Sequence, residues 1–360
     1  MRKSVELSRL FSSARQAVLG TDGIEIVFAN PRAQAALGFD PTGRPAADII
    51  PREILESTSE NFVCAAPLAG RKASISVSQQ EDGMVLFVEF MGGEKPAMYL
   101  TRNIISNLRS NMTGLKMSVD RCYDYFQTGA LPNEKYTSVL YHYYYCLLRT
   151  LTQIDSADLI ERGEMLFTPV ATDLVKLCGE LADTVTLLCS TQDVCIRFTT
   201  LESELFAVVD PARIEQLLLN LIANSFQHAK PSGHITLSLE KRQNSIVLSV
   251  DDDGEGIPQE MLPGIFCLPD DSEEPAAAND GLGLGLYIAY GIVQLHKGVL
   301  LIESRENEGT HVRVMLPADK EPSPKFKTPE AAYRIEGAAV ILTELADILP
   351  SSCYGPKFED

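Results

Sequence analysis

Several features that define other protein classes are missing from this 360-residue sequence. No run of 18 apolar residues occurs, so no segment has the length and hydropathy of a transmembrane helix. The first residues also lack the apolar core of a signal peptide. Basic charge is scarce: 31 Lys and Arg residues stand against 49 Asp and Glu residues, a formal net charge of −18. This charge argues against binding to nucleic acid or to anionic membrane surfaces. We therefore expect a cytoplasmic protein.

Metal-ligand spacing is missing as well. The eight cysteines form no CxxC pair and no other spacing typical of a metal site. We expect reduced thiols that are mostly packed in the interior. The chain shows no internal repeat, and its length is enough for two or three domains with a substantial core.

Residues 210–228 have the pattern of an amphipathic helix that carries two asparagines. Apolar residues recur at i, i+3, i+4, i+7 and i+8, at Ile214, Leu217, Leu218, Leu221 and Ile222. Asn220 and Asn224 are four residues apart, so they lie on one face of this helix. Two amide oxygens placed together can ligate a hard cation such as Mg²⁺.

Two glycine-containing turns follow this helix. An apolar strand at residues 245–250 runs into the sequence DDDGEGIP at residues 251–258. A carboxylate beside glycines, which allow close backbone approach, can accept a hydrogen bond from a ligand amine. Gly281, Gly283 and Gly285 then alternate at the start of an apolar helix. Free backbone N–H groups at such a helix start bind phosphate.

The order of these motifs resembles the ATP-binding domain of sensor histidine kinases, within the superfamily shared with DNA gyrase and the MutL mismatch-repair ATPases. The resemblance implies a two-layer α/β sandwich at residues 165–317 that binds ATP with Mg²⁺. It matches Asn220 and Asn224 to the paired asparagines of the family, with Asn224 as the Mg²⁺ ligand. It matches Asp252 to the aspartate that accepts from the adenine amino group. The remaining ATP-binding positions that it implies are Gly254, Gly256, Phe266 of the Ile265-Phe266 pair, Gly281, Gly283, Gly285 and Thr310 of the closing Gly309-Thr310 pair.

The first 94 residues alternate strand and short-helix signals. Residues 17–30 predict two strands joined by a tight turn, residues 31–37 predict a helix, and residues 71–90 predict a further hairpin. This segment resembles a PAS sensor module, and the alternative is another small α+β domain. The resemblance implies sensing but names no ligand. The residues that carry it are Asn30, Gly38 and Gly43.

Residues 95–164 show helical periodicity and no strand signal. Apolar side chains from Ile104 to Val119 recur every three or four residues and predict one long amphipathic helix, and residues 136–160 predict a second. Two antiparallel helices ahead of this ATP domain resemble the dimerisation and phosphoacceptor hairpin of the family, which pairs into a four-helix bundle. The resemblance implies a homodimer and a response regulator or other signalling protein as partner. The expected fold class is thus α+β, with several domains.

The last part of the chain, residues 318–360, begins with a Pro-rich linker and continues with a short apolar helix signal. The sequence leaves open whether this helix docks on its own ATP domain or on a partner.

The hairpin departs from the family at the phosphoacceptor. Alignment of Leu108-Arg109 with the usual Leu-Arg places Ser106 where the family has its histidine and Asn107 where it has an acidic residue. No histidine occurs in residues 1–141. Phosphoryl transfer requires an acceptor in line with the γ-phosphate, and the acidic neighbour is the usual base. Ser106 and His142, the one histidine of the hairpin, are the candidate acceptors.

A second departure lies near the phosphates. Gln227 and His228 stand where the family usually has a lysine, which implies a lower phosphate affinity.

Three functions fit these observations. The first is PAS sensing coupled to ATP-dependent phosphoryl transfer in a two-component system. The second is a catalytically impaired pseudokinase in which nucleotide binding regulates a partner. The third is a superfamily ATPase, which would carry a glutamate one helical turn before the metal-binding asparagine. That position is Asn220, and Glu215 lies more than two turns before Asn224, too far away to activate water.

Overall fold

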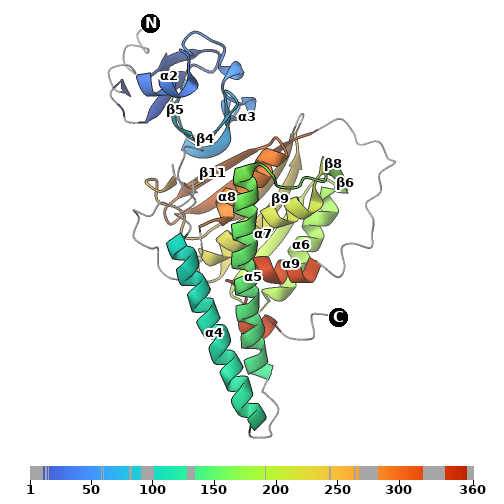
Figure 1. Cartoon of the computed structure of the whole chain (residues 1–360). Helices are drawn as coiled ribbons and strands as arrows, with labels where there is room; N and C mark the ends of the chain where they lie inside the picture. The colour runs from blue at the N-terminus through green and yellow to red at the C-terminus, as the bar shows by residue number, and fades with distance from the viewer. Residues whose placement is uncertain are drawn as a thin grey trace.

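The computed structural model describes residues 11–12, 14, 16–57, 59, 61–80, 83–90, 101–127, 134–190, 192–242, 245–262, 265–266, 283–318 and 337–354, without the side chains of 101–103 and 337–338. Three parts are visible in Figure 1: a small N-terminal module, a layer of sheet and helices, and a long helical hairpin whose tip points away from both. The mixed α+β class expected from the sequence is confirmed.

The N-terminal module is a five-stranded antiparallel sheet with short helices. Its elements are β1 (Ala17–Thr21), β2 (Ile26–Ala29), α2 (Pro31–Leu37), η1 (Ala46–Asp48), α3 (Arg52–Leu55), β3 (Asn61–Leu68), β4 (Arg71–Gln80) and β5 (Gly83–Phe90). Asn30 is fully buried and joins two of them: its Oδ1 accepts from Ala33 N at the start of α2 and from Val18 N in β1. The predicted strands and helix are confirmed, whereas the sequence reading missed β3.

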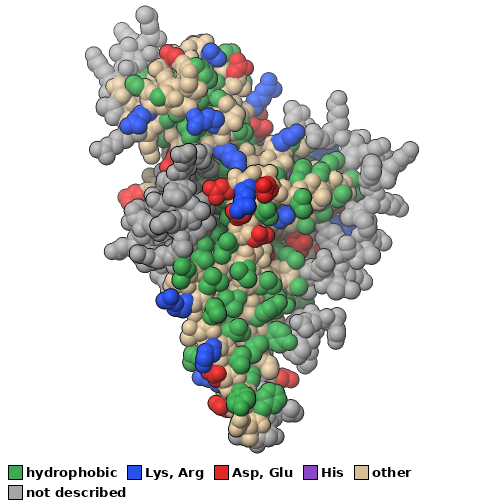
Figure 2. All heavy atoms as spheres, viewed as in Figure 1, with side chains coloured by type: hydrophobic (Ala, Val, Ile, Leu, Met, Phe, Trp, Pro, Cys, Tyr) green, Lys and Arg blue, Asp and Glu red, His purple; other side chains and the backbone are tan. Residues whose placement is uncertain are grey.

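The hairpin consists of α4 (Thr101–Gln127) and α5 (Glu134–Arg162). The two helices approach closely at Gly114, where a Cβ would overlap the ring of Tyr143. Figure 2 shows hydrophobic side chains over much of the hairpin surface in this view. The exposed large apolar side chains on it are Ile105, Met112, Met117, Val119, Tyr123, Phe126, Tyr144 and Leu151. Two long helices were predicted here and are confirmed.

The third part contains the motifs of the Asn helix and the glycine turns. Its elements are β6 (Val170–Asp173), α6 (Leu174–Leu188), β7 (Val194–Thr200), β8 (Phe206–Val209), α7 (Pro211–Gln227), β9 (Gly233–Lys241), β10 (Ser245–Asp252), α8 (Gly285–Leu295), β11 (Val299–Arg305) and β12 (Gly309–Pro317). The helices lie against one face of the sheet (Figure 1). Leu237 of β9 and Val314 of β12 share a buried core with Leu218 of α7 and Ile292 of α8. Along β9, buried and more exposed residues alternate, because successive side chains of a strand point to opposite faces of the sheet and only one face lies against the helices.

The sheets of the N-terminal module and of this third part are continuous. Strand β3 pairs antiparallel with β11, with Cys64 opposite Leu301, and the ten strands run in the order β2-β1-β5-β4-β3-β11-β12-β10-β9-β7. Val63 and Ala65 belong to the core under α7 and α8, while Leu301 belongs to the core of the N-terminal module. Each part therefore completes the core of the other. The sequence analysis assigned residues 1–94 and 165–317 to separate domains and did not anticipate this pairing.

After a stretch outside the described residues, the chain ends with α9 (Gly337–Glu344) and the 3-10 turn η3 (Ser351–Cys353). This segment packs on α5 and α7 of its own chain. The seven cysteines that the structure describes are all free, as expected, and most are buried or partly buried. No helix in the described part of the chain is long and apolar enough to cross a membrane.

Candidate functional site

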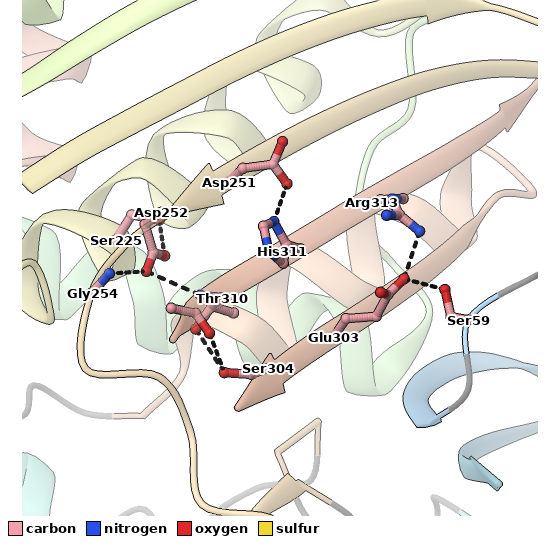
Figure 3. A network of polar contacts seen from close by, with 11 residues as sticks. Ser59, Ser225, Asp251, Asp252, Gly254, Glu303, Ser304, Thr310, His311 and Arg313 are labelled. Carbon is pink, nitrogen blue, oxygen red and sulfur yellow. Dashed lines mark hydrogen bonds and ion pairs between the residues drawn. The ribbon is translucent and has the colours of Figure 1, made fainter. Parts of the chain in front are cut away.

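Asp252 lies at the end of β10, and the residue is 8% exposed. Its Oδ1 accepts hydrogen bonds from Gly254 N at 3.0 Å and Thr310 N at 3.2 Å, and its Oδ2 accepts from Ser225 Oγ at 2.9 Å (Figure 3). A carboxylate offers about four lone-pair positions. Three are used here, so one position on Oδ2 remains for a further donor such as a ligand amine.

The electrostatics of Asp252 follow from its burial. Burial raises the pKa of its carboxyl group, and the hydrogen bonds from Ser225, Gly254 and Thr310 oppose that rise, as does the neighbouring His311. On the other face of the sheet edge, His311 Nδ1 lies 2.9 Å from Asp251 Oδ1, and this hydrogen bond raises the pKa of His311. The two adjacent carboxylates are thus held on different faces, and Asp252 alone is buried.

Three glycines allow the backbone to fold tightly around Asp252. A Cβ at Gly254 would lie 2.5 Å from the carbonyl oxygen of His228, the residue that caps the C-terminus of α7. Gly256 has a φ of +68°, and a Cβ there would overlap the carbonyl oxygen of Arg305. Gly309 has a φ of +105°, and a Cβ there would overlap the carbonyl oxygen of Asp252. These positions require glycine for steric reasons.

Ser304 connects the two sides of this turn. Its Oγ accepts from Ile257 N at 2.8 Å and donates to Gly309 O at 2.8 Å. Its single proton is then used, so Thr310 Oγ1, at 3.0 Å, is the donor in the contact with Ser304 Oγ (Figure 3). The Thr310 hydroxyl and backbone are therefore fixed beside Asp252.

The two asparagines of α7 face the beginning of α8. Asn220 is 1% exposed, and its Nδ2 donates to Gln216 O at 2.9 Å. Its Oδ1 is buried and has no hydrogen-bond partner among the described residues. A Cβ at Gly285 would lie 3.2 Å from Asn220 Oδ1 and 3.5 Å from Asn224 Oδ1, so glycine at this position lets α8 begin against both oxygens. A buried unpaired oxygen costs free energy, which a bound cation would offset.

Two amide oxygens suit Mg²⁺ that is shared with a phosphate ligand, and they are too few for a metal site built from protein ligands alone. Among the residues that the structure describes, no three or more His, Cys, Asp or Glu side chains gather as a metal site. Mg²⁺ takes hard oxygen ligands and is commonly held by one or two protein ligands together with substrate phosphates. Asn224 and Asn220 would supply amide oxygens, and the phosphates would supply the rest.

The start of α8 has the features of a phosphate site. Its N-cap residue, Leu284, makes no side-chain capping hydrogen bond, and Gly283 before it has a φ of +68°. The first backbone N–H groups are thus available to an anion. Gly281 lies outside the described residues. Phe266 is fully buried with its ring 6.2 Å from that of Tyr290, so it anchors the chain in the core.

The candidate acceptors lie on the hairpin, apart from this group. Ser106 is exposed on α4. His142 on α5 packs between the rings of Tyr143 and Tyr354, at 5.5 Å and 5.4 Å, and its burial lowers its pKa although Asp347 opposes this. The structure thus brings Asn220, Asn224 and Gly285 together and places Thr310 beside Asp252, which is bonded to α7 through Ser225. Both acceptor candidates lie on the hairpin.

Sequence analysis missed Ser225 and Ser304, which hold Asp252 and Thr310 in place. Ser225 was detectable, because a serine on the buried side of an amphipathic helix needs a hydrogen-bond partner. Ser304 carried no comparable signal, since its role depends on the pairing of β11 with β12.

Comparison with known proteins identifies this part of the chain. Residues 209–320 match the family described as histidine kinase-, DNA gyrase B-, and HSP90-like ATPase. They form a histidine-kinase-type ATP-binding domain. A stretch of 164 residues of this chain is 37% identical to the adaptive-response sensory kinase SasA of Synechococcus sp. (strain CC9902), covering 43% of this chain and 42% of SasA. The sensor histidine kinase ZraS of Escherichia coli is 29% identical over 149 residues, covering 41% of this chain and 31% of ZraS.

The chain thus spans less than half the length of these two relatives. Among solved structures, the histidine kinase ThkA in complex with the response regulator protein TrrA aligns over 86% of this chain and 98% of its own, with 18% identity and a TM-score of 0.43. The similarity to sensor histidine kinases that the motifs indicated is confirmed by the family match and the named relatives.

Proposed function

We propose that this protein is a signal-transduction protein of the sensor-histidine-kinase type whose ATP-binding domain binds ATP together with Mg²⁺. The observation that carries the proposal is the remaining lone-pair position on the buried Asp252, at the edge of a site that also contains Asn220 and the uncapped start of α8. Amine, metal and phosphate ligands are all represented within one domain. Bound ATP would present these three chemical groups at once.

The ligands are assigned to individual residues as follows. Asp252 would accept the hydrogen bond from the adenine amino group, and Asn224, with Asn220 beside it, would ligate Mg²⁺. The backbone at Gly283 and Gly285 would contact the phosphates. Gly254, Gly256 and Thr310 would shape the adenine side, and we extend the proposal to Phe266, which is buried beside Tyr290.

Of the signalling functions considered, the geometry favours one in which nucleotide binding regulates a partner. Ser106 is exposed, and its neighbour Asn107 is an amide whose Oδ1 accepts from Thr150 Oγ1 at 3.0 Å. A serine hydroxyl without a base is a poor nucleophile. His142 is covered by Tyr354. Phosphoryl transfer to a residue of this chain is therefore the second candidate, supported by the similarity to sensor kinases.

The superfamily ATPase is the least supported function. Asn220 occupies the position of the water-activating glutamate, and its amide cannot act as a base. Glu215 lies five residues before Asn220, so its side chain leaves the helix on a different face.

We propose that the hairpin forms a homodimer. Met112, Tyr123 and Phe126 of α4 and Leu151 of α5 are more than half exposed, which is unusual for so many large apolar side chains on one element. A second hairpin would cover them in a four-helix bundle. The N-terminal module is proposed to act as a PAS-type sensor, and a response regulator or other signalling protein as the partner. The cytoplasmic location inferred from the sequence is part of the same proposal.

The test is calorimetric titration with a nonhydrolysable ATP analogue, with Mg²⁺ and with EDTA. We expect binding by the wild type that weakens at least tenfold without Mg²⁺ and is lost in Asp252→Ala. Asp253→Ala is the matched control, because this neighbouring carboxylate is exposed and bonds to His234 instead. Absence of binding by the wild type, or equal binding by Asp252→Ala, would overturn the proposal.

A further inference from the structure

Residues 337–354, here called the C-terminal segment, contact the hairpin and the ATP-binding domain at the same time. On the hairpin side, Arg149 Nη1 of α5 donates to Asp347 Oδ2 at 2.7 Å, and the Arg149 side chain is only 7% exposed. On the other side, Gln216 Nε2 of α7 lies within hydrogen-bond distance of Glu344 Oε1, at 3.4 Å, and of Ser156 Oγ of α5, at 3.2 Å. One short segment therefore joins two parts of the molecule.

Apolar packing anchors this segment. Tyr354 is 1% exposed, and its ring centroid lies 5.4 Å from that of His142 and 5.2 Å from that of Tyr145. Its hydroxyl donates to Leu342 O at 3.1 Å, so the end of the segment is bonded to its beginning. The other buried apolar residues of the segment are Ile341, Leu342, Leu345, Ala346 and Leu349. Burial of this many side chains argues for a specific docked state.

A third set of contacts reaches the end of α6. Gln192 Nε2 donates to Ile348 O at 2.5 Å, and Cys353 Sγ donates to Leu188 O at 3.3 Å. The segment thus bridges α5 of the hairpin to both α6 and α7 of the ATP-binding domain. Rotation of that domain relative to the hairpin would break at least one of these contacts.

The docked state also contains polar groups that are not fully satisfied. Glu344 Oε2 and Arg149 Nε are buried and have no hydrogen-bond partner in the described part of the chain. Buried, incompletely paired charged groups cost free energy that water would return on release. The apolar packing stabilises the docked segment, and the free-energy cost of these unpaired polar atoms favours its release. A segment with both properties can dock and undock.

We propose that the C-terminal segment is an intramolecular latch, which in its docked state fixes the ATP-binding domain to the hairpin and covers His142. Release of the latch exposes His142 and frees the domain to move relative to α5. The latch concerns contacts outside the nucleotide site, so it stands or falls independently of ATP binding.

The experiment compares full-length wild type with the double variant Asp347→Ala/Tyr354→Ala, without nucleotide. Hydrogen exchange is followed in the C-terminal segment and in α5, and diethyl pyrocarbonate modification of His142 is followed by peptide mass spectrometry. We expect exchange at least tenfold faster in the segment and in residues 142–153, and His142 modification at least fivefold faster. Val340→Ala, an exposed position of the same segment, is the matched control and should leave all rates unchanged.

Two results would overturn the latch. In one, hydrogen exchange of the segment becomes faster while residues 142–153 stay protected and His142 stays unmodified, which would show that the segment does not cover α5. In the other, no rate changes, so Asp347 and Tyr354 do not hold it. Slow exchange of residues 235–241 in β9 and 245–250 in β10 confirms that the variant is folded. If the double variant is not folded, Asp347→Asn is measured in the same way, because it removes the charge and keeps the shape of the side chain. It must also accelerate hydrogen exchange in the C-terminal segment and in residues 142–153.

Discussion

Asn107 Oδ1 lies 3.0 Å from Thr150 Oγ1, whose single proton it shares with Cys146 O at 2.9 Å, and this contact ties α4 to α5 beside Ser106. The same oxygen lies 2.9 Å from Asn111 Nδ2, one turn further along α4. In the sensor histidine kinases that this chain resembles, an acidic residue at this position serves as a base. Here the side chain is neutral and engaged in holding the two helices together.

The first prediction is that no residue of this chain becomes phosphorylated under conditions in which ATP binds. Ser106 lacks a base and His142 lies against Tyr354, so neither acceptor candidate is activated. The measurement is incubation with radiolabelled ATP, followed by acid and alkali treatment. Acid-labile label lost in His142→Ala would establish a histidine acceptor, and acid-stable label lost in Ser106→Ala would establish a serine acceptor. Either outcome contradicts the prediction.

The second prediction is that alanine destabilises the protein at Gly256 and stabilises it at Gly179. Gly256→Ala places a Cβ against the carbonyl oxygen of Arg305 at a φ of +68°, so we expect a loss of about 2–4 kcal/mol in the free energy of unfolding. Gly179→Ala, inside α6, places its Cβ 3.8 Å from the Phe198 ring, an ordinary contact. It should stabilise the protein by up to about 1 kcal/mol because alanine favours the helix. Urea unfolding of both variants measures the difference, and equal midpoints would refute it.

The third prediction is a pH dependence of stability caused by Glu215. Burial raises the pKa of its carboxyl group from the ordinary value of 4.5 to about 7 in the folded protein. The folded state therefore binds this proton more tightly than the unfolded state does. The contribution of the protonated Glu215 to the free energy of unfolding is therefore complete below pH 4.5 and is lost as the pH rises to about 7. Glu215→Gln should remove that loss.

Urea unfolding of wild type and Glu215→Gln at pH 4.5 and pH 8 tests this dependence. Relative to the variant, the wild type should lose on the order of 2 kcal/mol over this interval. The exposed Glu204→Gln is the control and should follow the wild type. A parallel pH dependence in wild type and Glu215→Gln would show that the carboxyl group is not desolvated.

The fourth prediction is a dimer formed through the hairpin. Wild type should sediment at twice the chain mass of 39.5 kDa. Met112→Glu combined with Phe126→Glu should sediment as a monomer, because two buried charges would oppose the four-helix bundle. Leu201→Glu adds a charge at a fully exposed apolar site of the ATP-binding domain and should leave the dimer intact. Monomeric wild type, or a dimer that Met112→Glu/Phe126→Glu does not dissociate, would exclude this interface.

The sequence predicted most of the local structure, because local signals determine it. The helical period around Leu217 and Leu218 and the capping Asp210 specify α7, and the structure shows Asp210 Oδ1 accepting from Arg213 N at its start. The two asparagines follow from that period, since residues four apart share a face. The same holds for the helix that Asn30 caps.

The sequence could not predict contacts between distant segments. Pairing of Val63 with Ile302 depends on which sheet edge meets which, and neither strand carries a signal for its partner. The alternative left open for the C-terminal helix was settled by tertiary contacts such as Arg149 with Asp347, 198 residues apart. Ser304 likewise has a role only because β11 lies beside β12.

The central claim is that the open lone-pair position of Asp252 recognises the amino group of adenine. The most direct measurement compares the affinities of ATP and ITP, which differ at the base because ITP carries an oxygen in place of the amino group. With Mg²⁺, wild type should bind ATP at least tenfold more tightly than ITP, since ITP offers Asp252 no donor and leaves a buried carboxylate facing an oxygen. Asp252→Asn should lose this preference, because its amide can donate to that oxygen. Equal affinity of the wild type for the two nucleotides, or a preference that persists in Asp252→Asn, would contradict the account.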